Sequence, residues 1–179
     1  AEHEQERFRT VSSFSPLSRK TANTDSAYLD LHARPVTGLT IGAGVRHDDH
    51  SQFGQSTTAS TDLAYTPNDG ATTVRASYGE GYKAPSLYQL YGDFGTPGLR
   101  PETAKGWDAG VTQQLLEGAI TVGATIFRRR VINQIDFDLG TFTYANIQRA
   151  RARGVEIALR LTPSEASAAT DIYTFTNAR

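Results

Sequence analysis

The chain alternates apolar and polar residues over short segments, which is the pattern of β-strands with two different faces. The alternation is clearest in four segments, at residues 39–45, 107–111, 120–126 and 155–161. It is weaker in three more, at residues 27–34, 59–65 and 74–78. The positions between the apolar residues hold small or polar side chains, mainly Gly, Thr and Ser. This pattern predicts an all-β protein of about eight strands, with residues 1–10 as part of a ninth.

The segments between these strands are of two kinds. Short connections rich in turn-forming residues occur at 35–38, 67–71, 117–118 and 163–167. Longer or more polar connections occur at 11–23, 50–56 and 84–103. The two kinds alternate along the chain as far as Gly118. Because successive antiparallel strands turn at opposite ends, this alternation predicts an up-and-down meander with short turns at one end and long loops at the other.

The outward side chains favour a membrane-spanning barrel. They are aliphatic, with aromatic residues near the strand ends at Tyr65, Tyr78 and Trp107, as in a lipid-facing band with aromatic girdles. Residues 119–138 contain no strand breaker and predict one strand of about 20 residues, or roughly 66 Å, far longer than a usual globular strand. A complete small eight-stranded outer-membrane barrel with a structural or adhesive role remains an alternative, as does a soluble β-sandwich binding module.

Composition narrows the classes of function. The 18 Lys and Arg residues balance 19 Asp and Glu residues, which argues against a protein that binds nucleic acid through general positive charge. The longest apolar run is residues 41–45, whereas a membrane-spanning helix needs about 18 apolar residues or more. There is no Cys, so disulfides and thiolate chemistry are excluded.

No catalytic motif is convincing. Residues 79–84 fit the dinucleotide pattern G-x-G-x-x-A, and Glu102 follows about 20 residues later, where an acid would bind the ribose. However, Pro85 stands where the following helix would have to donate backbone N–H groups, so no crossover helix is expected. No Ser lies in a G-x-S-x-G motif. The sequence therefore predicts a protein that is not an enzyme and that carries no cofactor.

The run His47-Asp48-Asp49-His50 has the composition of a metal site. In a strand, however, His47 and Asp49 point to one face while Asp48 and His50 point to the other. Only a turn could bring the four side chains together. We therefore interpret the run as a polar strand end beside a loop, with a loop-bound cation as the alternative.

Five arginines continue the outward side of two predicted strands: Arg128, Arg130, Arg149, Arg151 and Arg153. A hairpin that turns near Gly140 would place Arg128 opposite Arg153 and Arg130 opposite Arg151. Like charges opposite one another are destabilising unless an anion lies between them. Above an outer-leaflet band that anion is the phosphate of lipopolysaccharide, which Arg binds well. Alternatively, the arginines are simply solvated, or a bulge near Gly154 turns them inward.

The segment at 74–92, together with residues 98–102 and 107–111, resembles the barrel of TonB-dependent outer-membrane receptors, nearest to the cobalamin and siderophore receptor branch. Residues 44–48 before 53–54, and 144–147 before 154–156, add to the likeness, which covers nearly the whole chain. The residues that carry the family motif are Gly79, Gly81, Tyr82, Lys83, Ala84, Pro85, Leu99, Pro101, Glu102, Gly154 and Glu156. We expect structural roles for them: Gly79 and Gly81 relieve crowding on the inner wall, Pro85 ends strand pairing, and Pro101 begins the next strand.

The resemblance implies a 22-stranded barrel around an N-terminal plug, in the outer membrane of a Gram-negative bacterium. It also implies TonB-coupled uptake of a scarce solute such as cobalamin or a ferric siderophore. The expected partners are outer-membrane lipid and lipopolysaccharide, the TonB complex through an N-terminal region that these residues do not include, and a small-molecule ligand. Residues 1–179 are then expected to be part of the barrel domain, without plug, TonB box or closing strand. In the loop at 84–103, Tyr88, Tyr91 and Phe94 are candidates for ligand contact, although loop aromatics also commonly pack the loop itself.

Overall fold

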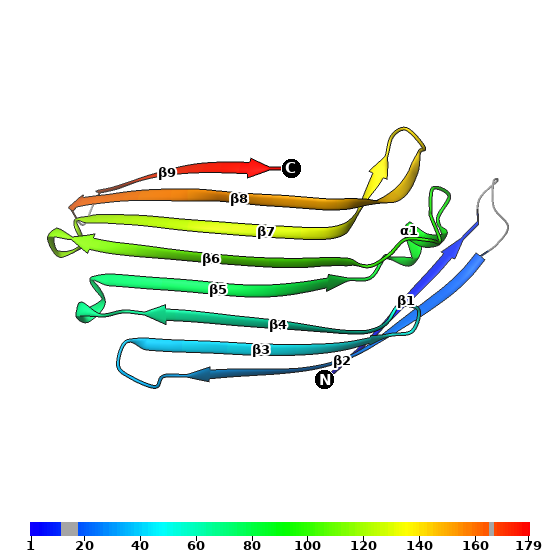
Figure 1. The fold of residues 1–179 in the computed structure, drawn as a ribbon, viewed down its shortest axis with the longest axis horizontal. Helices are drawn as coiled ribbons and strands as arrows, with labels where there is room; N and C mark the ends of the chain where they lie inside the picture. Colours follow the sequence, from blue (N-terminus) through cyan, green and yellow to red (C-terminus); the bar gives the residue numbers. More distant parts are fainter. Residues whose placement is uncertain (12–17, 165–166) are drawn as a thin grey trace.

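The described residues of the computed structural model (1–11, 18–164 and 167–179) form one antiparallel sheet in which every strand pairs with its neighbours in sequence (Figure 1). The strands are β1 (Glu2–Thr10), β2 (Ser18–Ala33), β3 (Leu39–His50), β4 (Gly54–Tyr65), β5 (Thr72–Lys83), β6 (Glu102–Leu115), β7 (Ile120–Asp138), β8 (Thr143–Ser164) and β9 (Ser167–Ala178). The helical elements are short: α1 (Leu87–Tyr91) and the single turns η1 (Asn68–Gly70) and η2 (Leu116–Gly118). In this described part of the chain, no helix is long and apolar enough to cross a membrane.

The predicted up-and-down meander is confirmed, with nine strands among the described residues, in agreement with about eight strands and a ninth that includes residues 1–10. The first strand is β1, which pairs along its whole length with β2. Its sequence carries polar or charged residues on both faces, so no apolar alternation marks it as a strand. β7 is 19 residues long and agrees with the long strand predicted at 119–138.

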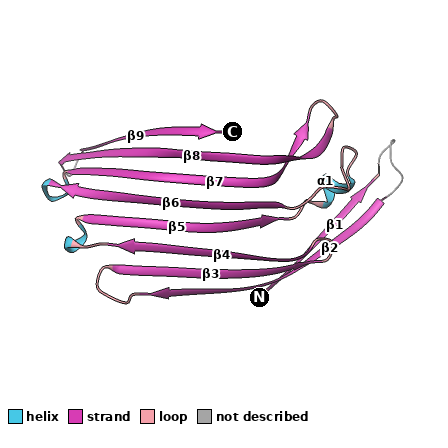
Figure 2. Ribbon diagram, in the orientation of Figure 1, coloured by secondary structure: helices cyan, strands magenta, loops and turns pink. Residues whose placement is uncertain are grey.

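Short turns gather at one end of the sheet and most long connections at the other (Figure 2). We call these the turn end and the loop end. One expected long connection is wrong: residues 51–53 alone join β3 to β4, because polar composition does not determine the length of a turn. The expected loop at 11–23 is also too long, since β2 already begins at Ser18. Residues 12–17 of that loop lie outside the described residues, as do residues 165–166 of the turn expected at 163–167.

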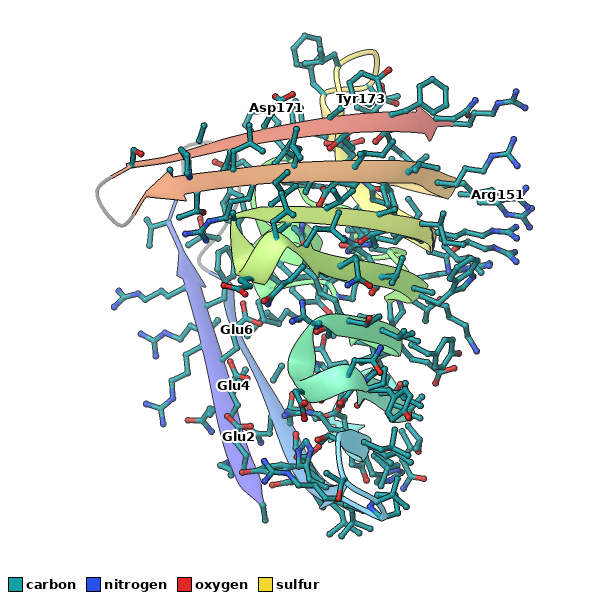
Figure 3. All side chains as sticks on the ribbon, turned by 90° about the vertical axis from the view of Figure 1, so that its left-hand side faces the viewer. Glu2, Glu4, Glu6, Arg151, Asp171 and Tyr173 are labelled. Carbon is teal, nitrogen blue, oxygen red and sulfur yellow. The ribbon has the colours of Figure 1, made fainter. Side chains whose placement is uncertain are left out.

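The sheet is curved, so it has a concave inner face and a convex outer face (Figure 3). Glu2, Glu4 and Glu6 lie on the inner side of β1, whereas Arg151 and Tyr173 project from the outer side. The outer face of β2–β8 carries a continuous set of exposed apolar side chains, which we call the apolar band: Leu29, Leu31, Ile41, Val45, Tyr65, Val74, Val111, Val122, Ile126, Val155, Ile157, Leu159 and Leu161. Asp171 interrupts this band on the edge strand β9, where it pairs with Leu159. The sheet has its polar surface inside and its apolar surface outside, as predicted.

The glycines of the inner face do not all have the role expected for them. A Cβ atom at Gly79 would meet no other atom within 4 Å, so crowding does not explain this glycine. At Gly81 the nearest atom would be the Cβ of Ala104, at an ordinary 3.6 Å. Gly154 is different, because a Cβ atom there would overlap the carbonyl oxygen of Phe175 and lie 2.6 Å from the ring of Phe127. The crowded motif glycine is therefore Gly154.

Replacing Gly154 by Ala is expected to destabilise the sheet by about 1–3 kcal/mol, since backbone as well as a side chain must move. Gly79→Ala is the matched control on the same face and is expected to change stability by less than about 0.5 kcal/mol. Thermal unfolding of the detergent-solubilised protein, followed by its heat-dependent migration on gels, measures both. Equal melting temperatures for the two variants would contradict the assignment.

Candidate functional site

The loop between β5 and β6 folds into a compact structure at the loop end. Its helix α1 begins at Leu87, and the N-cap residue Ser86 accepts through its side chain a hydrogen bond from the backbone N–H of Gln89. The side-chain oxygen of Gln89 in turn accepts the backbone N–H of Ser86 at 3.0 Å. This reciprocal pair is a capping box, and the spacing Ser86-x-x-Gln89 is the sequence signal that could have predicted this five-residue helix.

A small apolar cluster anchors the loop to the inner face. Leu90 and Leu99 of the loop are almost fully buried against Ile135 of β7. Phe53, Tyr91 and Tyr144 pack around these three residues. Since the rest of the inner face is mainly polar, this cluster holds the loop in place through the burial of apolar surface.

The loop bridges strands that are far apart in the sheet. On one side, the backbone N–H of Leu87 donates to Glu6 of β1 at 2.9 Å. On the other side, Phe94 accepts through its backbone oxygen from the N–H of Tyr144 on β8 at 3.1 Å. Figure 1 shows α1 beside the end of β1 at the loop end. The loop therefore crosses the inner side of the curved sheet.

Two further contacts strengthen this bridge. The ammonium group of Lys20 on β2 lies 4.7 Å from the centre of the Tyr91 ring, a cation–π contact. The side chain of Asn146 on β8 both accepts from the backbone N–H of Arg100 (2.8 Å) and donates to its carbonyl oxygen (2.9 Å). The same amide group donates to the carbonyl oxygen of Asn133 on β7.

The three aromatic ligand-contact candidates do not share one environment. Tyr88 and Phe94 are each about half exposed, at 50% and 49%. Tyr91 packs against the apolar cluster instead. Tyr88 and Phe94 are also the exposed members of a chain of edge-to-face ring contacts with centroids 5.4–6.2 Å apart, which runs through Phe8, Tyr88, Tyr144, Phe137 and Phe94. Tyr88 and Phe94 therefore expose part of their rings on the loop, whereas Tyr91 packs against the cluster that anchors it.

Beneath the loop, the inner wall is hollowed and charged. One hollow of about 630 Å³ is lined by charged or titratable side chains of three strands, β1, β3 and β5, among them Glu4, Glu6, Arg46, Asp48, His50 and Lys83. Arg46 donates to the buried carboxylate of Asp48 at 2.8 Å, and Asp48 also accepts from Ser26 at 2.6 Å. The hydroxyl of Tyr82, which lines the same hollow, is buried without a hydrogen-bond partner in the described residues.

The family motif residues join the two strands that flank the loop. Lys83, the last residue of β5, pairs with Glu102, the first residue of β6, through an ion pair of 3.0 Å. Ala84 and Pro85 follow directly, and strand pairing stops there as expected. Pro101 lies just before β6 rather than inside it. The motif therefore closes the base of the loop, and the Lys83–Glu102 pair is a contact that the sequence pattern did not reveal.

The turn between β7 and β8 borders the same end of the sheet. Asp138 closes it by accepting hydrogen bonds from the backbone N–H of Gly140 at 2.8 Å and from the hydroxyl of Thr141 at 3.0 Å. These two bonds keep the pKa of the Asp138 carboxyl, which lies well beyond the apolar band, below its usual value.

The run at 47–50 forms no metal site. His47 contacts Thr57 on one face of β3, whereas Asp48 and His50 are buried on the other face. The Nδ1 atom of His50 accepts the backbone N–H of Gln52 at 3.1 Å. Among the residues that the structure describes, no group of three or more His, Cys, Asp or Glu residues is placed to hold a metal ion.

The predicted pairing of the arginines is confirmed: Arg128 lies opposite Arg153, and Arg130 opposite Arg151. The register of β7 and β8 continues past Gly154 without a shift, so no bulge turns these side chains inward. Arg149 lies opposite Ile132 on the same outer face. We call Arg128, Arg130, Arg149, Arg151 and Arg153 the arginine patch. Glu156, the remaining motif residue, points to the inner face, where its carboxylate accepts from Thr174 of β9.

Comparison with known proteins identifies the class of this sheet. Residues 4–179 match the family described as TonB dependent receptor-like, beta-barrel, and the chain belongs to this family.

The same fold occurs in solved structures of outer-membrane receptors. The siderophore receptor PirA from Pseudomonas aeruginosa superposes with a TM-score of 0.79 at 24% identity, over 89% of this chain and 32% of that one. The ferric enterobactin receptor PfeA from Pseudomonas aeruginosa, as the Q482A mutant in complex with enterobactin, gives 0.77 at 22% identity, over 91% and 28%. The FrpB iron transporter from Neisseria meningitidis gives 0.71 at 16% identity, over 93% and 27%. The chain thus spans between about a quarter and a third of the length of these proteins.

Leu90→Ala is expected to weaken the attachment of the loop by about 2–5 kcal/mol, since a buried side chain is removed from the cluster. The exposed Phe94–Gly95 bond should then be cut faster by chymotrypsin, as measured by mass spectrometry of the digest. Leu116→Ala, at a residue that is 73% exposed at the turn end, is the matched control and should leave the cleavage rate unchanged. Unchanged cleavage in Leu90→Ala would show that the cluster does not hold the loop.

Proposed function

We propose that these residues form part of the wall of an outer-membrane receptor that takes up a scarce solute, with a ferric siderophore as the first candidate. The observation that carries the proposal is the inside-out sheet: apolar side chains cover the convex face, and polar side chains cover the concave face. Such a sheet suits lipid outside and a polar lumen inside. Membership of the TonB-dependent receptor family supports the same function.

The edge of the apolar band that faces the loop end supports membrane insertion independently. Ile41 on β3 and Ile126 on β7 lie in one continuous row of paired residues. Toward the loop end, β3 still has the apolar Ala43 and Val45 before His47, whereas β7 changes directly to Arg128. The edge of the band therefore runs obliquely across the strands. Strands that cross a membrane in a barrel are tilted by about 35–45°, and a flat membrane surface then meets successive strands at different residues.

The ligand class rests on two different likenesses. PirA is described as a siderophore receptor, PfeA as a ferric enterobactin receptor and FrpB as an iron transporter, and this chain shares their fold. The motif at 74–92 resembles the cobalamin receptor branch, which makes cobalamin the second candidate. In both cases the proposed binding surface includes the exposed rings of Tyr88 and Phe94. Energy for uptake would come from the TonB complex, through a plug that precedes the barrel in the family.

Membrane insertion predicts different effects for two neighbouring substitutions on β8. Ile157→Arg puts a charge on the outer face near the middle of the apolar band, which costs about 2–4 kcal/mol in lipid. Ala158→Arg puts the same charge on the polar inner face and should be tolerated. The amount of folded protein in the outer-membrane fraction measures the difference. If both variants accumulate equally, the outer face does not meet lipid.

Uptake tests the function directly. The complete gene is expressed in a strain that lacks its own siderophore and cobalamin receptors, and uptake of radiolabelled ferric siderophores and of cobalamin is measured with and without TonB. The expected result is TonB-dependent uptake of one of these ligands.

The double variant Y88A/F94A should weaken binding of that ligand about tenfold or more, since exposed aromatic anchors dominate many binding surfaces. L139A/F142A, which removes two exposed apolar side chains from the neighbouring β7–β8 turn, is the control. Absence of TonB-dependent uptake of either ligand would refute the proposal, and unchanged affinity in Y88A/F94A would remove these rings from the site.

A further inference from the structure

The sheet is split between β4 and β5 at the loop end. Pairing of these two strands stops at Ser60 opposite Gly79, so half of β4, residues 54–59, has no partner on that side. On their other sides, β4 pairs with β3 and β5 pairs with β6 along their whole lengths. Figure 1 shows β4 and β5 diverging toward the loop end. We call the two unpaired segments, residues 54–59 and 80–83, the seam.

Side chains close the seam in place of backbone hydrogen bonds. The backbone N–H of Ala59 donates to the carboxylate of Glu80 at 3.3 Å, where a continued ladder would offer a carbonyl oxygen. The hydroxyl of Tyr78 (2.6 Å) and the ammonium group of Lys105 (2.7 Å) hold this carboxylate in place. The packing beside it is loose, because Glu80 and residues of β2, β3 and β4 line a hollow of about 260 Å³.

Tyr82 shows that β5 turns out of the sheet beyond the last pair. Tyr78 lies opposite Trp107 on the outer face, and alternation assigns Tyr82 to the same face. Tyr82 nevertheless lines the inner hollow beside Asp48, and its hydroxyl is buried there without a partner among the described residues. A buried hydroxyl without a partner is costly. The outer face is therefore an alternative position for this side chain.

The two strands keep the means to pair further. No Pro interrupts either segment, so every backbone donor is available. Continuing the register by four residues places Ala59 opposite Glu80, Thr58 opposite Gly81, Thr57 opposite Tyr82 and Ser56 opposite Lys83. Gly79 and Gly81 lie where the strands diverge, and glycine allows a strand to bend. This bend gives Gly79 a role that crowding does not explain.

The apolar cluster under the β5–β6 loop lies between the two sides of the seam. Leu90 and Leu99 belong to the loop and Ile135 to β7, whereas Phe53 belongs to the turn between β3 and β4. The cluster thus occupies the space between ends that further pairing would bring together. The contacts of the loop with β1 and β2, described above, cross the seam as well.

We propose that the seam is a two-state switch and that the position of the loop selects its state. In the open state, described here, the cluster keeps the strand ends apart and Tyr82 lines the hollow. In the closed state, residues 56–59 pair with residues 80–83, and Tyr82 turns to the outer face and leaves the hollow.

The two states are close in free energy. Burial of the cluster favours the open state, and additional backbone hydrogen bonds favour the closed one. A displacement of the loop is then enough to shift the populations, and a solute that displaces the loop changes the shape of the hollow beneath it. The switch follows from the fold alone and does not depend on the proposed function.

Disulfide formation detects the closed state. The test uses the complete protein in mild detergent, with any cysteine outside residues 1–179 replaced by Ser. T58C/G81C places two thiols opposite one another only when the seam is closed. D62C/S77C, on the same face of the same two strands, lies within the paired part and is the matched control. Because a disulfide needs Cα atoms about 4.4–6.8 Å apart, the rate of formation under a mild oxidant reports the closed population.

The control pair is expected to form its disulfide about tenfold or more faster than T58C/G81C, since the open state predominates. Adding L90A, which removes part of the cluster, should speed T58C/G81C about tenfold and leave the control pair unchanged. E6A, which removes the acceptor for the loop on β1, is a second loosening variant and should act in the same direction. L116A, at the turn end, should change neither rate.

Hydrogen exchange, resolved to single residues by mass spectrometry, tests the switch without cysteines. Every second amide of β4 points to β5, as that of Ala59 does. Thr57, beyond the last pair, should therefore exchange about tenfold or more faster than Thr61, within the paired part. L90A and E6A should slow exchange at Thr57 because they favour closure, whereas a general loss of stability would speed it.

Three results would overturn the inference. The first is an equal rate for the two cysteine pairs in otherwise wild-type protein. The second is a T58C/G81C rate that neither loosening variant changes. The third is faster exchange at Thr57 in both loosening variants. Uptake of the solute enters none of these measurements, so failure of the proposed function and failure of this inference are distinguishable.

Discussion

The structure depends on one constraint: each strand must satisfy its backbone hydrogen bonds through its neighbours while its side chains divide between two different environments. The pairing of β2–β9 keeps the apolar band on one face without a register shift from β3 to β8. A slip of a single residue would exchange the two faces of a strand. Such a slip in β7 would send Phe127 and Arg129 outward and the cationic side chains of Arg128 and Arg130 inward. Register, more than the identity of any one residue, decides what each surface meets.

The sequence predicts well the strands that cross the apolar band, because the two faces of these strands differ in chemistry. β3, β6, β7 and β8 were all visible as apolar residues at every second position. β1 shows no such alternation, since it pairs with the loop-end half of β2 alone and carries glutamates on one face and His, Gln and Arg on the other. Where both faces are polar, alternation contains no information about a strand, and only the pairing with a neighbour reveals it.

The site was predicted in part for a similar reason. The opposition of Arg128 and Arg153 follows from counting residues on either side of a turn near Gly140, so the sequence was enough. The position of Lys105 opposite Arg130, and of Arg179 opposite Arg151, depends on the registers of two further strand pairs, which no local pattern specifies. The packing of Tyr91, unlike that of Tyr88 and Phe94, depends on Leu99 and Ile135, which reach the same place from distant parts of the chain. Local sequence identifies aromatic residues of a loop but not which of them the fold buries.

The loop that joins β5 to β6 has a mechanical consequence. Hydrogen bonds hold it to β1 through Leu87 and Glu6, and to β8 through Phe94 and Asn146. The curved sheet forms an arc, and the loop joins two points of this arc as a chord does. For an arc of given length, here the strands from β1 to β8, the length of the chord fixes the radius. The curvature at this end of the wall is therefore set by a segment only about 18 residues long, in addition to the twist of the strands themselves. A force on the loop is transmitted at once to strands seven positions apart in the sheet, without passing through the strands between them.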